Sequence, residues 1–461
     1  MKGHSLMKIP FVVVILRLLI LLAKVAIYRT KHTPLLPDNK HAVGIFWGAI
    51  AVIFILILNS LPYTPEMLSP LGKQNLKPLT EEKDSQEVFG FAPYWTINKL
   101  ENVDFNVLTT LAYFGVPVKG DGNLDKRNQG YTTFKSDSAT EVFLKAHERN
   151  TRIVLTLTQM NNGEINRLLE NPAAQKRAID QAVNEVRERG IDGVNIDFEY
   201  VGNPGQEKRS QFTNFVASLT NEMKKAVPHS KVTVSVYASS ARDPKIYEIG
   251  KLAKVSDGIF MMAYDFATTN AEVAMPTAPL YGHKEGKYWY DISTAVDDFL
   301  KEMQAEKLIL GLPWYGYNYP VYEPGDKAET RRGYYVYSWV KTKKGKRQVR
   351  NFISFPRHAQ TYELARGEVL SDQPGFKTGW DELGQVGWSA YLKGGIWRMI
   401  FLEDAKSLGI KYDFAKSKSL GGVGMWALGF DSGSSEMWKL LNEKFGVKQV
   451  GGDIARNENN I

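Results

Sequence analysis

The chain has 461 residues, and its 43% apolar and 23% charged content is typical of a globular protein and not of a disordered one. It has no cysteine, which excludes disulfides, thiolate catalysis, iron–sulfur clusters and cysteine-based zinc sites. No two of its seven histidines have the i, i+4 or i, i+2 spacing of a metal-binding pair, which argues against a metal hydrolase. We expect no cofactor.

The net charge of +8 is concentrated near the N-terminus. Residues 1–62 hold seven lysines and arginines against the single acidic residue Asp38, so the other 399 residues carry a surplus of only +2. Non-specific binding to nucleic acid needs a concentrated basic surface, and we therefore expect no nucleic-acid partner.

Residues 1–62 are predicted to form a membrane segment. Residues 42–61 are twenty uncharged and mostly apolar residues, enough for a helix to cross a bilayer. A cleavable signal peptide is the alternative, but this run is longer than a signal core, lies far from the start and lacks a small-x-small cleavage site. A second apolar run, 9–28, contains Arg17 and Lys24, each costing about 3 kcal/mol near the bilayer centre, so this run either spans the membrane or lies on it.

Basic residues between the two apolar runs predict the orientation. Arg29, Lys31 and Lys40 should stay cytoplasmic, which places the rest of the chain on the extracytoplasmic side, at the cell surface or in the periplasm. Residues 63–86 contain three prolines among polar residues and are expected to form a linker.

Eight short segments rich in β-branched and aromatic residues follow the linker, and we interpret them as buried strands. They begin near Val88, Val107, Arg152, Gly193, Lys231, Gly258, Lys307 and Gly422. Between them lie helical patterns, the clearest of which runs from the candidate cap Asn171 to Gly190. Strands that alternate with helices form a parallel sheet, and eight of them predict an α/β fold, a closed (β/α)₈ TIM barrel.

The last connection of the barrel is too long for one helix. Residues of about 319–395 contain short aromatic strands, which predicts a small α+β subdomain inserted between strands seven and eight, beside the mouth of the barrel. The basic tract 341–347 within it is interpreted as a solvated hairpin tip in preference to a binding site. The whole barrel is assigned to residues 87–445, and residues 446–461 to a C-terminal tail.

The segment 191–200 contains the polar residues that carry most information about function. Side chains two apart on a strand share a face, so Asn195, Asp197 and Glu199 should point together into the barrel. Burying two carboxylates costs several kcal/mol unless they are partnered or neutral, which a structural role rarely justifies. A buried ion pair with lysine or arginine is the structural alternative to catalysis.

The spacing of these carboxylates restricts the chemistry. They should lie about 7 Å apart and couple their titrations, so that one of them retains a proton. Glu199, nearest the barrel mouth, is the candidate general acid, as glycoside hydrolysis requires. Two residues on one strand face cannot easily flank a scissile bond, so Asp197 is badly placed as a nucleophile. The exception is a substrate that supplies its own nucleophile, the 2-acetamido oxygen of an N-acetylhexosamine.

In these residues the sequence resembles family 18 glycoside hydrolases, the chitinase-like enzymes, whose signature on barrel strand four is DGxDxDxE. Asp192, Gly193, Asn195, Asp197 and Glu199 occupy that frame. The resemblance implies that Glu199 protonates the glycosidic oxygen and later activates water. It also implies that Asp197 orients the acetamido group and stabilises an oxazolinium-type intermediate. The segment is most similar to the bacterial branch with spore-cortex and peptidoglycan lytic enzymes.

Two further segments match the family in order, so that the resemblance covers about 88–445. MMAYDF is similar to the family's sixth-strand Met-x-Tyr-Asp. It implies that Tyr264 hydrogen-bonds the acetamido oxygen and that Met262 and Asp265 contact the sugar. GVGMWALGFD implies that Trp426 forms an apolar floor beneath the sugar, which suits the apolar C–H face of a pyranose.

One residue departs from the family pattern. Asn195 stands where the commonest signature has Asp, so Asp197 lacks a neighbour with which to share a proton. Asn195 remains a candidate substrate-binding residue and can donate a hydrogen bond to Asp197. The departure affects the expected pH profile and leaves the expected mechanism unchanged.

Aromatic residues beside two predicted strand ends are further candidates. Tyr94 and Trp95 follow the first strand, and Trp314 and Tyr315 follow the seventh. Each either lines the cleft and stacks on a sugar or packs in the core.

Together these features predict a membrane-anchored, monomeric, retaining glycoside hydrolase that cleaves peptidoglycan or a chitin-like polymer by substrate-assisted catalysis. Chitin, peptidoglycan and N-glycans all present the acetamido group. The alternative is a catalytically weak or inactive carbohydrate-binding protein of the cell envelope on the same fold. The acid Glu199 favours the enzyme.

Overall fold

A computed structural model describes residues 76–80, 86–343 and 345–446, all within the second of the two units into which the chain divides, Pro65–Ile461. Within these ranges no helix is long and apolar enough to cross a bilayer. The predicted membrane segments 9–28 and 42–61 lie outside the described residues, as does nearly all of the predicted C-terminal tail.

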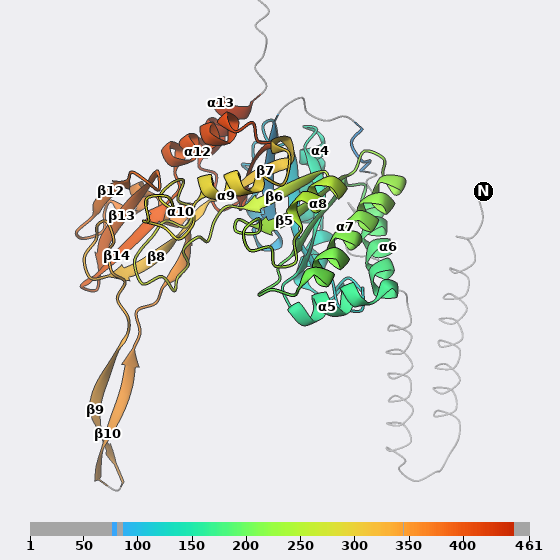
Figure 1. Ribbon diagram of the computed structural model, residues 1–461. Helices are drawn as coiled ribbons and strands as arrows, with labels where there is room; N and C mark the ends of the chain where they lie inside the picture. The colour runs from blue at the N-terminus through green and yellow to red at the C-terminus, as the bar shows by residue number, and fades with distance from the viewer. Residues whose placement is uncertain (1–75, 81–85, 344, 447–461) are drawn as a thin grey trace, which may run out of the picture. The chain divides into compact units, whose positions relative to one another are not determined.

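Eight parallel strands close into a barrel, which confirms the predicted fold (Figure 1). They are β1 (Glu87–Pro93), β2 (Thr110–Pro117), β3 (Arg152–Gln159), β4 (Gly193–Phe198), β5 (Lys231–Tyr237), β6 (Gly258–Met262), β7 (Leu308–Pro313) and β15 (Gly422–Trp426). The second strand begins three residues later than Val107 because the backbone N–H groups of Val107 and Leu108 both donate to the Asp104 carbonyl, forming a turn.

Helices cover the outside of the barrel (Figure 1). They are α3 (Gln129–Phe134), α4 (Asp137–His147), α5 (Asn162–Glu170), α6 (Pro172–Arg189), α7 (Gln206–Ala226), α8 (Ile249–Val255), α9 (Ile292–Phe299), α12 (Ala405–Ser417) and α13 (Ser435–Phe445), with short 3-10 turns η3 (Tyr94–Lys99) and η4 (Ala305–Lys307). Helix α6 begins and ends as predicted: the Asn171 side chain accepts from the first-turn amides, and Gly190 ends the helix with a left-handed φ of 67°.

Two apolar layers follow from the alternation of side chains along the strands. On β4, Val194, Ile196 and Phe198 are fully buried in the core between the barrel and its helices. The barrel interior is filled by a smaller cluster that includes Phe89, Phe91 and Phe260. Successive residues on one strand therefore point alternately outward, toward the helices, and inward, into the barrel. Only the inward-pointing residues can reach the barrel mouth.

The subdomain between β7 and β15 is built on an antiparallel five-stranded sheet in the order β11-β8-β14-β13-β12. Its strands are β8 (Tyr315–Val321), β11 (His358–Thr361), β12 (Lys377–Asp381), β13 (Val386–Lys393) and β14 (Ile396–Leu402), with the short helices α10 (Tyr362–Ala365) and α11 (Gly367–Leu370). The sheet thus begins and ends outside the predicted bounds 319–395, since β8 follows β7 after one residue. Tyr319, Met399 and Phe401 belong to a core of its own.

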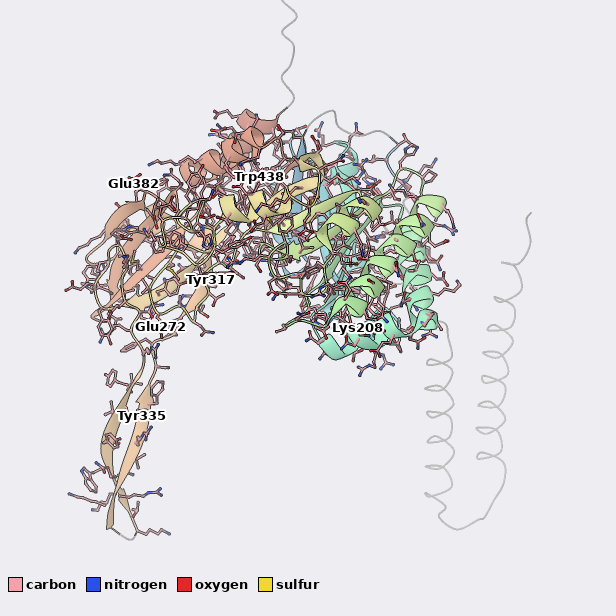
Figure 2. The ribbon with its side chains drawn as sticks, viewed as in Figure 1. Lys208, Glu272, Tyr317, Tyr335, Glu382 and Trp438 are labelled. Atoms are coloured by element: carbon pink, nitrogen blue, oxygen red, sulfur yellow. The ribbon has the colours of Figure 1, made fainter. Side chains whose placement is uncertain are left out.

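A two-stranded antiparallel hairpin, β9 (Tyr334–Thr342) and β10 (Gly345–Ile353), extends away from this sheet (Figures 1 and 2). The basic tract 341–347 lies at its tip. Figure 2 shows the side chain of Tyr335 standing out from the hairpin stem.

Candidate active site

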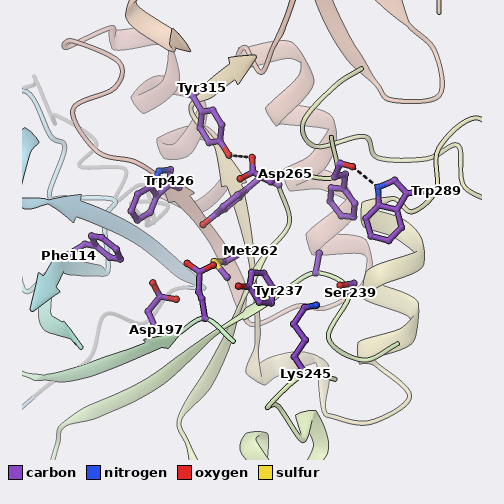
Figure 3. A pocket seen from close by; sticks show the side chains of 14 residues that line it. Phe114, Asp197, Tyr237, Ser239, Lys245, Met262, Asp265, Trp289, Tyr315 and Trp426 are labelled. Carbon is purple, nitrogen blue, oxygen red and sulfur yellow. Dashed lines mark hydrogen bonds between the residues drawn. The ribbon is translucent and has the colours of Figure 1, made fainter. Parts of the chain in front are cut away.

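A pocket of about 410 Å³ opens among the C-terminal ends of the barrel strands. It is lined by Phe114, Asp197, Glu199, Tyr237, Ala238, Ser239, Lys245, Met262, Tyr264, Asp265, Phe266, Trp289, Tyr315 and Trp426. Figure 3 shows Phe114 and Trp426 on one side of the pocket, Trp289 on the other, and Asp197 and Tyr237 between them. Seven of the candidate site residues are therefore brought together here: Asp197, Glu199, Met262, Tyr264, Asp265, Tyr315 and Trp426.

Asp197 and Glu199 reach the pocket from the end of β4. Phe198 between them is buried in the outer core, and the Glu199 amide extends the ladder by donating to the Gln159 carbonyl over 2.9 Å. Asp197 is only 4% exposed, and within the described residues its Oδ1 atom has no hydrogen-bond partner. An unpartnered oxygen in a buried carboxyl is costly unless a ligand satisfies it.

Burial raises the pKa of both carboxyl groups. For Asp197 the loss of solvation is the larger cause, and the charge of Glu199 adds to it. For Glu199 burial again dominates, a hydrogen bond from Tyr237 lowers its pKa, and the charge of Asp265 raises it. The net direction for Glu199 is upward, as a general acid that must hold its proton near neutral pH requires.

Asn195 does not line the pocket, and its predicted hydrogen bond to Asp197 is wrong. Its Nδ2 atom donates to Ser235 Oγ over 3.0 Å, and its Oδ1 atom accepts from Thr233 Oγ1 over 2.8 Å. The cause is the register of β4 and β5, which pairs Asn195 with Thr233 one pleat below the pocket floor. Hydroxyl groups of β5 therefore satisfy the fully buried amide.

Asp192, the first residue of the signature frame, lies at the opposite end of β4. Its carboxylate accepts from the backbone N–H groups of Leu79 at 2.6 Å and Ile153 at 2.7 Å, and its Oδ2 atom lies 2.7 Å from His147 Nε2. It therefore joins the segment 76–80 and helix α4 to the base of the barrel and has a structural role.

Asp265, at the exposed rim of the pocket, is held by three hydroxyl groups. Its Oδ1 atom accepts from Thr277 at 3.1 Å, from Tyr317 at 2.8 Å and from Tyr315, the last of these drawn in Figure 3. Its backbone has a left-handed φ of 59°, a conformation that Asp tolerates better than most residues, and its N–H donates to Thr277 Oγ1. Strand β8 of the inserted subdomain thus contributes directly to the site.

Aromatic rings form one wall of the pocket. The Trp426 ring lies 4.8 Å from that of Phe114 and 5.5 Å from that of Phe91. Trp95 is 50% exposed, and its ring lies 6.4 Å from that of Trp426, so it extends the wall beyond the pocket. Tyr94 packs its ring against Trp95 at 4.8 Å and against the outer core, and it is absent from the pocket lining.

Of the two alternatives for Trp314, packing in the core is the one observed, and its assignment as a substrate-binding residue is wrong. Its side chain is fully buried in the outer core, with its ring 5.5 Å from that of Trp438 on α13. The reason is that side chains alternate along a strand. Leu312 and Trp314 continue the outward-pointing residues of β7, whereas Tyr315 points inward and lines the pocket.

Sequence reasoning missed several lining residues. Phe114 lies at an inward position within β2, and Tyr237 at one at the end of β5, so the alternation of side chains on those strands could have identified them. Trp289 and Lys245 lie on loops, where no periodic signal exists. The Trp289 indole N–H donates to the Phe266 carbonyl over 2.6 Å, and this bond positions the outer ring (Figure 3).

Within the described residues no group of three or more histidine or acidic side chains is arranged to hold a metal ion. The chemistry that the pocket offers is that of a buried proton donor, a second buried carboxyl group, tyrosine hydroxyls and apolar ring faces. Such a set suits a neutral, partly apolar ligand with hydrogen-bonding groups, as a sugar is.

Comparison with known proteins agrees with this description. The family model "Glycosyl hydrolases family 18" matches residues 87–431. YvbX of Bacillus subtilis, described as an uncharacterized glycosylase, is 27% identical over 282 residues, which cover 60% of this chain and 68% of that protein.

Solved structures share the fold. A GH18 chitinase from Cycas revoluta in complex with (GlcNAc)3 superposes with a TM-score of 0.62 at 19% identity, over 78% of this chain and 99% of that one. The spore cortex-lytic enzyme SleL of Bacillus megaterium QM B1551 superposes with a TM-score of 0.57 at 17% identity, over 80% of this chain and 75% of that one.

Proposed function

Because this chain belongs to the glycosyl hydrolases of family 18, we propose that it is a retaining glycosidase that cleaves β-linked N-acetylglucosamine-containing polysaccharide with help from the substrate's own acetamido group. The predicted family and the predicted class of enzyme, a glycosidase, are confirmed by the family match. The mechanism, the polymer and the location of the enzyme are our proposals.

The observation that supports the mechanism best is how the three carboxyl groups of the pocket are placed and hydrogen-bonded. Glu199 and Asp197 come from one strand end, and Asp265 already accepts hydrogen bonds from three hydroxyls. The three donors all reach Oδ1 of Asp265, which holds this carboxylate at the rim of the pocket and draws electron density from it, so it is a weakened nucleophile. Asp197 lies beside the acid instead of across the bond from it. A nucleophile carried by the substrate accounts for this arrangement.

In the first step, the acetamido oxygen of the substrate attacks C1 while the bond from C1 to the glycosidic oxygen breaks. The leaving oxygen takes the proton of Glu199, whose raised pKa keeps it protonated for this purpose. In the second step, water attacks C1 from the face that the leaving group occupied. Glu199 takes a proton from that water, the bond between C1 and the acetamido oxygen breaks, which regenerates the acetamido group, and the anomeric configuration is retained.

Asp197 is proposed to hold the acetamido group. Its unpartnered Oδ1 atom is a ready acceptor for the acetamido N–H, and its charge stabilises the positive intermediate. The Tyr264 hydroxyl, in the same pocket, is proposed to donate to the acetamido oxygen, and Trp426 to lie beneath the sugar ring. Both carboxyl groups lose solvent on folding, which strengthens these interactions.

We propose peptidoglycan or a chitin-like polymer as the substrate, acted on by a monomer on the extracytoplasmic side of a membrane. The likeness to a spore cortex-lytic enzyme supports the first polymer, and the likeness to a chitinase supports the second. The apolar runs 9–28 and 42–61 support an anchor.

The test compares wild type with Glu199→Gln on a chromogenic chitobioside and on purified peptidoglycan, with mass analysis of the products. We expect turnover to fall at least a hundredfold, on the order expected for loss of a general acid, while the circular dichroism spectrum is unchanged. A second arm uses de-N-acetylated oligosaccharides, which should not be cleaved. Binding of oligosaccharides by a wild-type protein that cleaves none of them would favour a carbohydrate-binding protein instead.

A further inference from the structure

The β9–β10 hairpin takes no part in the active site, yet its surface is strongly apolar. Of the residues described in its two strands, only Ser338 and Val349 are partly buried. The exposed large apolar side chains are Tyr334, Tyr335, Val336, Tyr337, Trp339, Val340, Phe352 and Ile353, with Trp339 67% exposed. Soluble proteins rarely expose so many apolar side chains side by side, and such a surface marks a binding site.

The strand register separates these side chains onto two faces. One face carries the cross-strand pairs Tyr335–Phe352, Tyr337–Arg350, Trp339–Gln348 and Lys341–Lys346. The opposite face carries Tyr334–Ile353, Val336–Asn351, Ser338–Val349 and Val340–Arg347. The first face is therefore an aromatic row, on which the Tyr335 and Phe352 rings lie 5.0 Å apart and the Arg350 guanidinium lies 3.5 Å from the Tyr335 ring centre. Half of the second face is aliphatic: Val336, Val340, Val349 and Ile353.

The charge of the hairpin has a single sign. Residues 334–353 contain four lysines and two arginines and no acidic residue, and all of these cations except Arg350 lie in the tip, 341–347. A partner with complementary charge is anionic. Exposed Trp and Tyr together with Lys and Arg are the side chains that settle at a membrane–water interface, where the rings lie at head-group depth and the cations meet lipid phosphates.

We propose that the β9–β10 hairpin is an interfacial arm that lies on the surface of an anionic phospholipid bilayer. Both edges of a two-stranded sheet expose unpaired backbone groups, which the hydrated head-group layer can satisfy and hydrocarbon cannot, so the arm lies in the interface and does not cross the bilayer. Nine residues in a strand give it a length of about 30 Å.

Other occupants explain less of the surface. A neutral glycan strand would stack on the aromatic row but would leave the six positive charges of the hairpin without counter-charges. A second copy of the hairpin would bring six more positive charges against the first six. The proposal goes beyond the proposed hydrolase activity and does not depend on it, because it concerns contact with lipid alone.

The chain contains no cysteine, so a single labelled position can be introduced anywhere. Full-length Gln348→Cys protein, labelled with an environment-sensitive fluorophore, is reconstituted with vesicles of phosphatidylcholine or of equal parts phosphatidylcholine and phosphatidylglycerol. Gln348 is exposed and lies opposite Trp339. We expect a blue shift, and quenching by brominated lipid, only in the vesicles with phosphatidylglycerol, with reversal at high salt. Asn150→Cys, on an exposed turn of the barrel, is the control position.

Variants of the basic tip test whether its positive charges cause the binding to anionic lipid. Replacing Lys341, Lys343, Lys346 and Arg347 with Gln should weaken the response to anionic vesicles at least a hundredfold in lipid concentration, whereas replacing the three lysines with Arg should preserve it. Both variants should keep the circular dichroism spectrum and the urea unfolding midpoint of wild type, which shows that the barrel remains folded. Three results would overturn the proposal: an unshifted probe in both vesicles, an equal response in neutral vesicles, or a spectral shift without lipid that accompanies dimer formation.

Discussion

The hydroxyl of Tyr315, the first residue of the inserted sheet, donates a hydrogen bond to Asp265, which follows the sixth barrel strand. The hydroxyl of a buried tyrosine in the subdomain thus fixes a carboxylate at the rim of the barrel pocket. Because β8 follows β7 after a single residue, this contact is set by the chain connection itself. The subdomain is therefore part of the active site and not an appendage to it.

Tyr315→Phe should lower kcat/KM about fivefold to tenfold, since one hydrogen bond to a carboxylate is lost, equivalent to about 1 to 1.4 kcal/mol. Steady-state kinetics on a chitobioside measures it. Tyr319→Phe is the matched control, because its hydroxyl donates to the Thr268 carbonyl at 2.9 Å and not to Asp265. Equal losses in the two variants would indicate that general loosening of the subdomain, and not the Asp265 contact, is responsible.

The pH profile should respond to Tyr237. Its hydrogen bond lowers the pKa of Glu199 and so opposes the effect of burial. Tyr237→Phe should raise that pKa further, and since Glu199 acts as the acid, the alkaline limb of kcat/KM should move to higher pH. Tyr247→Phe, whose hydroxyl donates to the Phe198 carbonyl over 2.7 Å, should leave the limb in place. A shift to lower pH in Tyr237→Phe would contradict this assignment.

The barrel could be predicted from the sequence because its strands are continuous apolar runs and α6 has both of its boundary residues, Asn171 and Gly190. The alternation of side chains along a strand decides which residues point into the barrel, and hydrophobicity alone does not reveal this. Continued past the end of β7, the alternation places Trp314 outward and Tyr315 inward. The error over Trp314 came from treating two adjacent aromatic residues as equivalent.

Parts of the site depend on contacts between elements distant in sequence, which no local pattern encodes. The partners of Asn195 are set by the register of β4 against β5, and a one-residue change in that register would alter them. Trp289 lies on a loop and is positioned through a carbonyl twenty-three residues earlier in the chain. Helix α13 was not predicted either, and its Trp438 ring packs against Trp314.

Glu199→Gln should stabilise the protein at neutral pH while it abolishes turnover. The folded-state pKa of Glu199 is raised above its unfolded value, so the native state binds its proton more tightly. The free energy of unfolding therefore falls as pH rises through the unfolded and then the folded pKa, by about 1.4 kcal/mol for each unit of the shift. The neutral amide avoids this loss.

Urea unfolding of wild type and Glu199→Gln at several pH values measures that difference. The gain in the free energy of unfolding should be present at neutral pH and disappear in acid, below the unfolded pKa, where both side chains are uncharged. Asp197→Asn should show the same trend, since burial raises the pKa of Asp197 as well. A variant that is less stable than wild type at neutral pH would mean that the carboxylate is better solvated than its burial indicates.

A buried ion pair should hold the end of the subdomain to the barrel. Lys411 on α12 lies 2.5 Å from both carboxylate oxygens of Glu403, directly after β14, and both side chains are almost fully buried. Burial is the first cause that raises the pKa of Glu403 and lowers that of Lys411, so each charge is tolerated only because of the other. Lys411→Met should cost about 3 to 5 kcal/mol of stability, because it leaves a carboxylate buried alone. In urea unfolding, the double variant Glu403→Gln with Lys411→Met should recover much of that loss. A double variant no more stable than Lys411→Met alone would show that α12 contributes packing of the lysine stem at this position, and not a charge pair.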